Sequence, residues 1–123
     1  MNELKVKEYL GKQIEFKMIN GEVYANANSM AETQKLKDWK RSKNTTKYLV
    51  ALEAKKNNGV ENSHTRFIIS ESGLGTLNGT WIHEKLILSL ARYISVEFEI
   101  WCDEQIATLL REGQVSIKQG TIS

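Results

Sequence analysis

Residues 79–98, GTWIHEKLILSLARYISVEF, decide the fold, because a strand and the starts of two helices follow one another within this segment. The Thr-Trp-Ile triplet favours an extended strand, since β-branched and aromatic side chains fit a pleated surface. From Leu86 the apolar residues recur at helical spacing and form one stripe that would face a core. Ser95 then offers an oxygen to the free amides of the next helix. The segment therefore predicts a strand followed by helices over residues 84–94 and 96–110.

A β-hairpin is predicted over residues 12–25, because Asn20 and Gly21 suit the positive φ angles of a two-residue type I′ turn. In the register set by that turn, Met18 pairs with Val23 and one face of the hairpin becomes apolar. The apolar face carries Ile14, Phe16, Met18, Val23 and Ala25, and the other face carries Glu15, Lys17 and Tyr24.

Two helices are expected between this hairpin and the next strand. The sequence SMAE at residues 29–32 has the form of a capping box, which predicts a short helix that begins at its second residue. Residues 36–44 are expected to form a helical turn and a loop. Asn44 or Thr45 would then cap a second helix that ends near Lys56, before two asparagines and a glycine.

A second hairpin is predicted to pair residues 66–70 with residues 80–82 around a glycine-rich tip at residues 71–78. With two β-hairpins and about four helices, the chain is predicted to adopt an α+β fold of small winged-helix-like type. Residues 1–112 would form this domain. Residues 113–123 are mostly polar and include two glycines. They are expected to be a tail or a linker to a further C-terminal region.

The composition, with 41% hydrophobic and 26% charged residues, is typical of a soluble globular protein. No apolar run is long enough to span a bilayer, and the N-terminal residues alternate in charge instead of forming a signal peptide. The single cysteine excludes an internal disulfide. We therefore expect a protein of the reducing cytoplasm that does not enter a membrane.

Charge is distributed unevenly along the chain, although the net charge is only +2. Residues 35–56 contain eight basic and two acidic residues, a local charge of +6. Residues 97–112 contain one basic and five acidic residues, a local charge of −4. This asymmetry predicts one face that attracts polyanions and another that does not. The alternative interpretation is an ordinary solvated surface rich in lysine.

Three motifs occur in order along the chain. The first comprises Asn26, Ala27, Asn28, Ser29 and Met30, and the second comprises Asp38 and Trp39. The third comprises Gly79, Thr80, Trp81, Ile82, His83, Leu86, Ser95, Glu97 and Phe98. In this order they resemble the KilA-N domain, a DNA-binding module of phage and large-virus proteins that is related to the fungal APSES domain. Val96 replaces a proline that is usual in the family, but a first-turn proline is not required to start a helix.

The resemblance covers about residues 21–110. It implies a phage or prophage regulator of transcription, often an antirepressor, that binds double-stranded DNA in a bacterial host cell. It also implies that the glycine-rich tip at residues 71–78 is the wing of a winged helix. The matched residues belong mostly to the scaffold, so the DNA contacts are inferred from charge and helix geometry instead.

Placing successive residues about 100° apart predicts which side chains of the helix after Asn44 point inward. Tyr48, Leu49 and Leu52 would face the core, whereas Thr46, Lys47, Val50, Ala51 and Ala54 would face outward. Small and methyl-bearing side chains suit close approach to a major groove. Alternatively, Val50 and Ala54 pack on a neighbouring element.

The predicted DNA contacts come from the basic stretch, the following helix and the second hairpin. Within this set, Lys40, Arg41 and Lys43 would hold phosphates, and Thr46, Lys47 and Val50 would face base edges. Arg66 and the hairpin tip would reach the neighbouring DNA backbone or the minor groove. His64 is either a phosphate contact or a surface residue without a function. The full set is Lys37, Lys40, Arg41, Lys43, Asn44, Thr46, Lys47, Val50, His64, Arg66, Ser72 and Asn78.

Neither a cofactor nor a metal is predicted. The glycines at positions 73, 75 and 79 lack the spacing of a dinucleotide fingerprint, and a strand follows them instead of a helix. His64, His83 and Cys102 show no ligand-pair spacing. No nucleophile, base and orienting group occur in a recognisable arrangement, so we do not expect an enzyme.

Four side chains that could carry chemistry are better explained by structure. Cys102 lies on an apolar stripe and is expected to be buried. His83 would hold the corner between a strand and a helix. Trp81 and Trp101 are expected in the core, whereas Trp39, flanked by charges, could either join the core or stack on a base.

A second functional hypothesis is a protein-interaction module. The acidic helix over residues 96–112 would contact a repressor and inactivate it directly, without any need for DNA. The chain could also form a homodimer.

Overall fold

The structure, a computed structural model, describes the backbone of residues 4–57, 66–71 and 79–122, and the side chains of residues 4–56, 66–70 and 79–112. Its elements are β1 (Leu4–Tyr9), β2 (Lys12–Ile19), β3 (Glu22–Asn26), α1 (Ala27–Met30), α2 (Thr33–Arg41), α3 (Lys43–Asn57), β4 (Ile68–Glu71), β5 (Gly79–His83), α4 (Glu84–Ile94) and α5 (Val96–Ile122). The strands form one antiparallel sheet in the order β1-β2-β3-β5-β4. The predicted α+β class is confirmed.

The β2–β3 hairpin has the predicted turn and register. Asn20 and Gly21 have φ angles of 53° and 82°, and Met18 pairs with Val23. The predicted apolar face is buried, apart from a half-buried Met18. Part of the opposite face is also covered, because Lys17 and Tyr24 are buried, and the Tyr24 hydroxyl donates to the Arg66 carbonyl (2.8 Å).

Strand β1 was not predicted. It pairs with β2 through a turn at Leu10 and Gly11, whose φ angles are 50° and 82°. Two of its lysines lie on the core side of the sheet, because Lys5 and Lys7 pair with the core residues Phe16 and Ile14 and share their face. Residues such as Val6 therefore lie on the other face, where Val6 is 47% exposed.

The predicted capping box at residues 29–32 is wrong. Helix α1 is capped by Asn26, whose side chain accepts a hydrogen bond from the Asn28 amide (3.0 Å). Ser29 instead accepts from the Glu15 amide of β2 (3.0 Å), a contact 14 residues away in sequence. Helix α2 then begins after Glu32 without a side-chain cap, and it replaces the short turn and loop that were expected.

The start of α3 also differs from the prediction. The helix begins at Lys43, one residue before the expected cap, because the Thr45 amide donates to the hydroxyl of Ser42 (3.1 Å). The second hairpin is confirmed, although β4 begins at Ile68 and leaves Arg66 before the strand. The segment between Glu71 and Gly79, which was predicted as the tip, lies outside the described residues.

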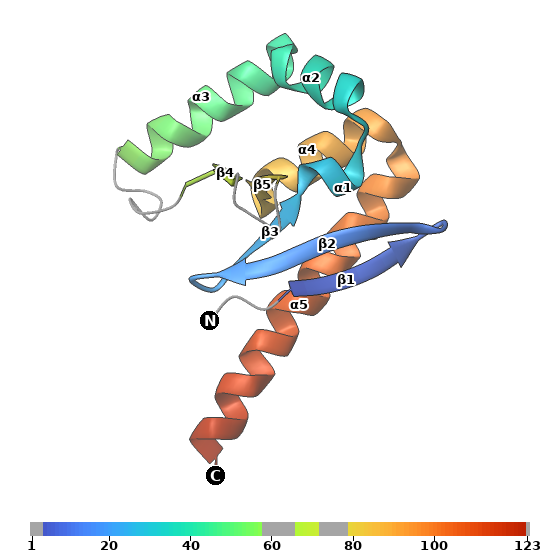
Figure 1. The fold of residues 1–123 in the computed structure, drawn as a ribbon. Helices are drawn as coiled ribbons and strands as arrows, with labels where there is room; N and C mark the ends of the chain where they lie inside the picture. The colour runs from blue at the N-terminus through green and yellow to red at the C-terminus, as the bar shows by residue number, and fades with distance from the viewer. Residues whose placement is uncertain (1–3, 58–65, 72–78, 123) are drawn as a thin grey trace.

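Helices α4 and α5 cover one face of the sheet, and in Figure 1 α5 passes behind β1 and β2 while α4 lies above β3. Helix α4 has the predicted bounds, and α5 starts at Val96 with the Phe98 amide donating to Ser95 Oγ (3.0 Å), as predicted. Its backbone continues to Ile122, beyond the predicted end at residue 110. The core between helices and sheet includes Phe16, Met30, Trp39, Ile82, Leu86, Leu90 and Phe98.

The three tryptophans have different surroundings. Trp39 is buried and its Nε1 donates to Ser89 Oγ (3.1 Å), which places it in the core. Trp101 is half-buried against Tyr9, with 5.0 Å between ring centroids. Trp81 is fully buried as predicted, but it lies on the opposite face of β5 from Ile82, with the Lys17 ammonium 4.1 Å from its ring centroid.

Candidate nucleic-acid interface

Helices α2 and α3 are joined through the single residue Ser42, which has extended backbone angles. Its amide donates to the Trp39 carbonyl (3.2 Å) and its hydroxyl accepts from the Thr45 amide (3.1 Å), so one residue closes the first helix and caps the second. Leu36 and Trp39 anchor α2 in the core, while Leu52 anchors α3. The pair forms an arch above the sheet and α4, with α3 extending toward β4 (Figure 1).

Basic side chains surround this junction on the solvent side. The exposed ones near the junction are Lys37, Lys40, Arg41, Lys43 and Lys47, and Lys55 is exposed near the other end of α3. Arg41 contacts Asp38 (3.1 Å) and Lys56 contacts Glu53 (2.8 Å), so the two acidic residues of the stretch are both engaged locally. Because the Arg41–Asp38 pair is solvent-exposed, it restrains the guanidinium only weakly. A strongly positive surface therefore remains around the start of α3.

The outward face of α3 matches the helical prediction. Thr46, Lys47, Val50, Ala51 and Ala54 are exposed, and Val50 is 63% exposed. Val50 and Ala54 are therefore not packed on a neighbouring element, which was the alternative interpretation. Thr46 Oγ1 donates back to the Ser42 carbonyl (3.1 Å) and leaves its methyl group available at the surface. This face combines small, methyl-bearing and cationic side chains.

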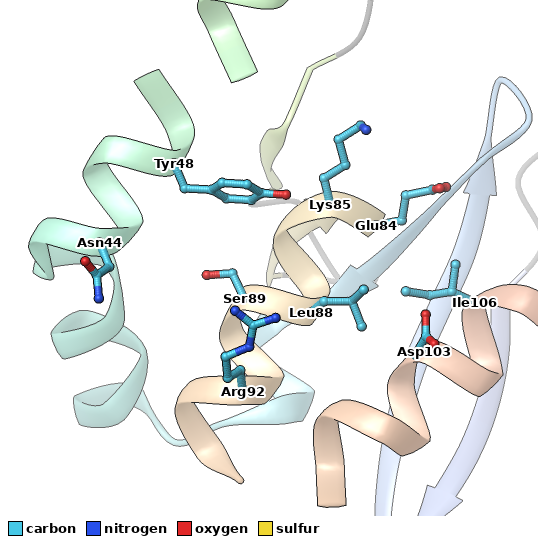
Figure 2. A pocket seen from close by; sticks show the side chains of 9 residues that line it. All are labelled: Asn44, Tyr48, Glu84, Lys85, Leu88, Ser89, Arg92, Asp103 and Ile106. Atoms are coloured by element: carbon cyan, nitrogen blue, oxygen red, sulfur yellow. The ribbon is translucent and has the colours of Figure 1, made fainter. Parts of the chain in front are cut away.

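Asn44 and Tyr48 lie on the other side of α3, where they line a groove of about 480 Å³ with residues of α4 and α5. Figure 2 shows Tyr48 extending from α3 toward α4, above Ser89. Tyr48 was predicted to face the core, but it is 41% exposed because this groove separates the two helices. The prediction for Leu52 is confirmed, since it is buried.

Two cationic side chains in this groove were missed by sequence reasoning. Lys85 and Arg92 are exposed on α4, seven residues apart, and they face the same opening as Asn44. The Arg92 guanidinium donates to Glu99 (2.7 Å), which raises the pKa of Arg92. The apolar stripe of α4 was the signal used to predict the helix, and the complementary polar stripe would have revealed these two residues.

The remaining predicted contacts come from the second hairpin and the segment before it. Arg66 is exposed two residues before β4 begins, and its carbonyl accepts from Tyr24. His64, Ser72 and Asn78 lie outside the described residues. The base of the hairpin is well defined, because Ser70 pairs with Thr80 and Glu71 with Gly79.

The hairpin base is held against the corner between β3 and α1. The Thr80 amide donates to Asn28 Oδ1 (3.0 Å), and Asn26 Nδ2 donates to Glu15 Oε1 (2.9 Å). The Asn26 amide packs so closely against Gly79 that a Cβ at that position would overlap it. Residues of the first and third sequence motifs thus meet in space and position the strands that lead to the predicted tip.

The strand-to-helix corner is held by His83, as predicted. His83 Nδ1 accepts from the Lys85 amide (3.2 Å) and caps α4, while Nε2 lies 2.9 Å from Glu22 Oε2.

Burial raises the pKa of the Cys102 thiol to about 12. Within the described ranges, histidine, cysteine and carboxylate side chains form no group of three that could hold a metal ion.

Comparison with known protein families identifies a DNA-binding domain. The family model of the KilA-N domain matches residues 7–112. None of the curated proteins or solved structures compared with the chain matches it. Within the described part of the chain, no helix has both the length and the apolarity needed to cross a membrane.

Proposed function

We propose that this chain, which belongs to the KilA-N domain family of DNA-binding domains, binds double-stranded DNA sequence-specifically and places α3 in the major groove. The observation that carries the proposal is the outward face of α3, where small and methyl-bearing side chains lie beside lysines at an exposed helix start. A helix in the major groove needs close approach to base edges, and its N-terminal residues are those that contact bases in helix-turn-helix proteins.

The proposed DNA contacts divide into contacts with phosphates and contacts with bases. Lys37, Lys40, Arg41 and Lys43 precede or open α3, where cations and free helix amides meet phosphates. Thr46, Lys47 and Val50 face the bases, and methyl groups of threonine and valine suit the thymine methyl. Asn44 lies at the edge of the groove behind α3 and holds the neighbouring phosphate. On the side of the second hairpin, His64, Arg66, Ser72 and Asn78 reach the DNA backbone or the minor groove.

The resemblance to the KilA-N family supports a regulatory role. The chain acts as a transcription regulator of phage or prophage origin in the cytoplasm of a bacterial host, with antirepression as its task. Residues 1–112 supply the DNA-binding domain, and residues 113–123 serve as a tail or a linker.

Binding to a random-sequence DNA pool, measured by gel shift over a range of salt concentrations, tests the proposal. If about four to six phosphates are neutralised, log K falls against log salt with a slope of about −4 to −5. Replacing Lys40, Arg41 and Lys43 together by alanine should reduce the slope by about 3. Arg111→Ala, which removes an exposed cation from the acidic helix α5, is the matched control and should leave the slope unchanged. Affinity that does not respond to salt would contradict the proposal.

A further inference from the structure

An apolar groove of about 470 Å³ lies between the tip of the β1–β2 hairpin and the corner between α4 and α5. Tyr9, Leu10, Ile94 and Phe98 form its apolar wall. Two further apolar residues are exposed on α5, where Val96 and Ile100 are 61% and 56% exposed and lie one helical turn apart. None of these residues belongs to α2 or α3, so the groove is separate from the candidate DNA interface.

Leu10 is the unusual member of this surface. It is 88% exposed at a turn with φ angles of 50° and 82°, nearly the same as the 53° and 82° of the Asn20–Gly21 turn. Asparagine suits the left-handed conformation and leucine does not, because a Cβ there crowds the following carbonyl and only short polar side chains offset this locally. Two turns of matching geometry in one molecule therefore carry the favoured residue in one case and a strained, exposed leucine in the other.

Neither the turn nor the core explains this leucine. Scattered apolar residues on a surface need no explanation, but apolar residues gathered around a groove mark interaction sites. Leu10 borders the groove, and Ile94 and Phe98 line it from the corner between α4 and α5. A partner that covers Leu10 would remove a large apolar side chain from water and offset the strain of the turn.

Charge indicates which partner fits. Carboxylates lie on the same exposed side of α5 as Val96 and Ile100, because Glu97 and Glu104 fall within about 100° of Val96 around the helix axis. Glu97 lines the groove itself. The cation at the groove, Lys12, already donates from its ammonium to the Met30 carbonyl (2.9 Å). A second copy of this chain would bring the same carboxylates against these, whereas a basic partner would complement them.

We propose that this surface docks a basic amphipathic helix of a second protein. The helix would place apolar residues at i and i+4 into the groove beside Leu10 and Ile100, with lysine or arginine bordering them to meet Glu97 and Glu104. Because the groove and α3 lie on different elements, the chain can hold DNA and this partner together.

Fluorescence anisotropy with two synthetic helical peptides of about 14 residues tests the proposal. Both carry leucines at i and i+4, but one is flanked by lysines and the other by glutamates. The lysine peptide should bind, and Leu10→Asn should weaken it at least about tenfold, since the burial of one leucine accounts for such a factor. Val50→Asn, which alters a 63% exposed apolar residue of α3, is the matched control and should bind the peptide as the parent chain does.

Thermal melting separates docking from folding, because Leu10→Asn places a favoured residue in the turn and should melt at the same temperature as the parent or higher. Equal binding of both peptides, or unchanged binding by Leu10→Asn, would overturn the proposal. Sedimentation over a range of protein concentrations should show no association through this surface. A dimer that Leu10→Asn dissociates would show that a second copy is the occupant and would also overturn it.

Discussion

Gly79 cannot carry a side chain, because the Asn26 amide occupies the space where a Cβ would stand. This close approach explains why a glycine opens β5 opposite the asparagine that ends β3. Asn26 bonds Glu15, and Asn28 bonds the Thr80 amide, so a few polar contacts fix the base of the second hairpin. At the scale of single residues, the sequence motifs are explained by steric fit and hydrogen bonding.

Gly79→Ala should therefore destabilise the domain by more than an unfavourable backbone conformation alone would. We expect a loss of about 2 to 4 kcal/mol in the free energy of unfolding, from overpacking added to an unfavourable φ. Urea denaturation measures this loss. Gly11→Ala is the control, because Gly11 has a φ of 82° and nothing within 4 Å of a Cβ. A Gly79→Ala protein no less stable than Gly11→Ala would show that the Asn26 contact yields easily.

Cys102 should not react with thiol reagents at pH 8 until the domain unfolds. Burial raises the pKa of its thiol to about 12, so the reactive thiolate is absent at this pH. The raised pKa also means that the folded state holds this proton more tightly than the unfolded state. The contribution of the protonated Cys102 thiol to the free energy of unfolding is fully present below its ordinary pKa of 9.0. This contribution is lost as the pH rises from 9.0 to about 12. Reaction with an aromatic disulfide reagent, with and without urea, tests the accessibility, and rapid modification of the native protein would contradict it.

At the scale of elements, α2 and α3 present their charges because their few apolar residues are used for anchoring. Leu36 and Trp39 hold α2, and Leu52 holds α3, which leaves the remaining surface of both helices to lysine, arginine and small residues. Ser42 lets one helix follow the other after a single residue. The proposed division between holding and recognition follows from this arrangement, with phosphates met before α3 and bases met along it.

Substitutions in these helices should separate the two roles. Arg41→Ala should weaken binding to all DNA sequences about equally, whereas Lys47→Ala or Val50→Asp should change the preferred sequence. Binding-site selection from a random pool, repeated for each variant, measures this. If Arg41→Ala shifted the selected motif and the α3 variants left it unchanged, α3 would not be the recognition helix.

Across the whole molecule, packing is concentrated between the sheet and helices α4 and α5. Helix α4 has four buried apolar residues, Leu86, Ile87, Leu90 and Ala91, within its 11 positions. Helix α3 has 15 positions, and among its described side chains Thr45 and Leu52 are buried. The positive surface is therefore carried by the less tightly packed part of the domain, and the acidic helix α5 belongs to the firmly packed part.

Hydrogen exchange should reflect this distribution. Amides of α3 should exchange faster than amides of α4, because few buried contacts oppose local opening of α3. Bound DNA should protect α3 more than α4. Exchange measured by NMR in the free and DNA-bound protein tests both statements, and equal protection of the two helices in the free protein would contradict the first.

Features that depend on neighbouring residues were predictable from the sequence. The Asn20–Gly21 turn set the register of β2 and β3, since a two-residue turn leaves one pairing for the strands. The change from strand to helix spacing gave the bounds of α4, and Ser95 was correctly predicted as the cap of α5. The exposed face of α3 followed from helical geometry once the helix was located.

Features that depend on distant partners required the tertiary structure. Strand β1 exists because β2 pairs with it, with lysines on the face that a local pattern reserves for apolar residues. Ser29 failed to cap a helix because the Glu15 amide from another strand competes for its hydroxyl. Tyr48 points into a groove because α4 stands opposite it. In each case the free energy comes from a contact between residues far apart in sequence, which no local pattern encodes.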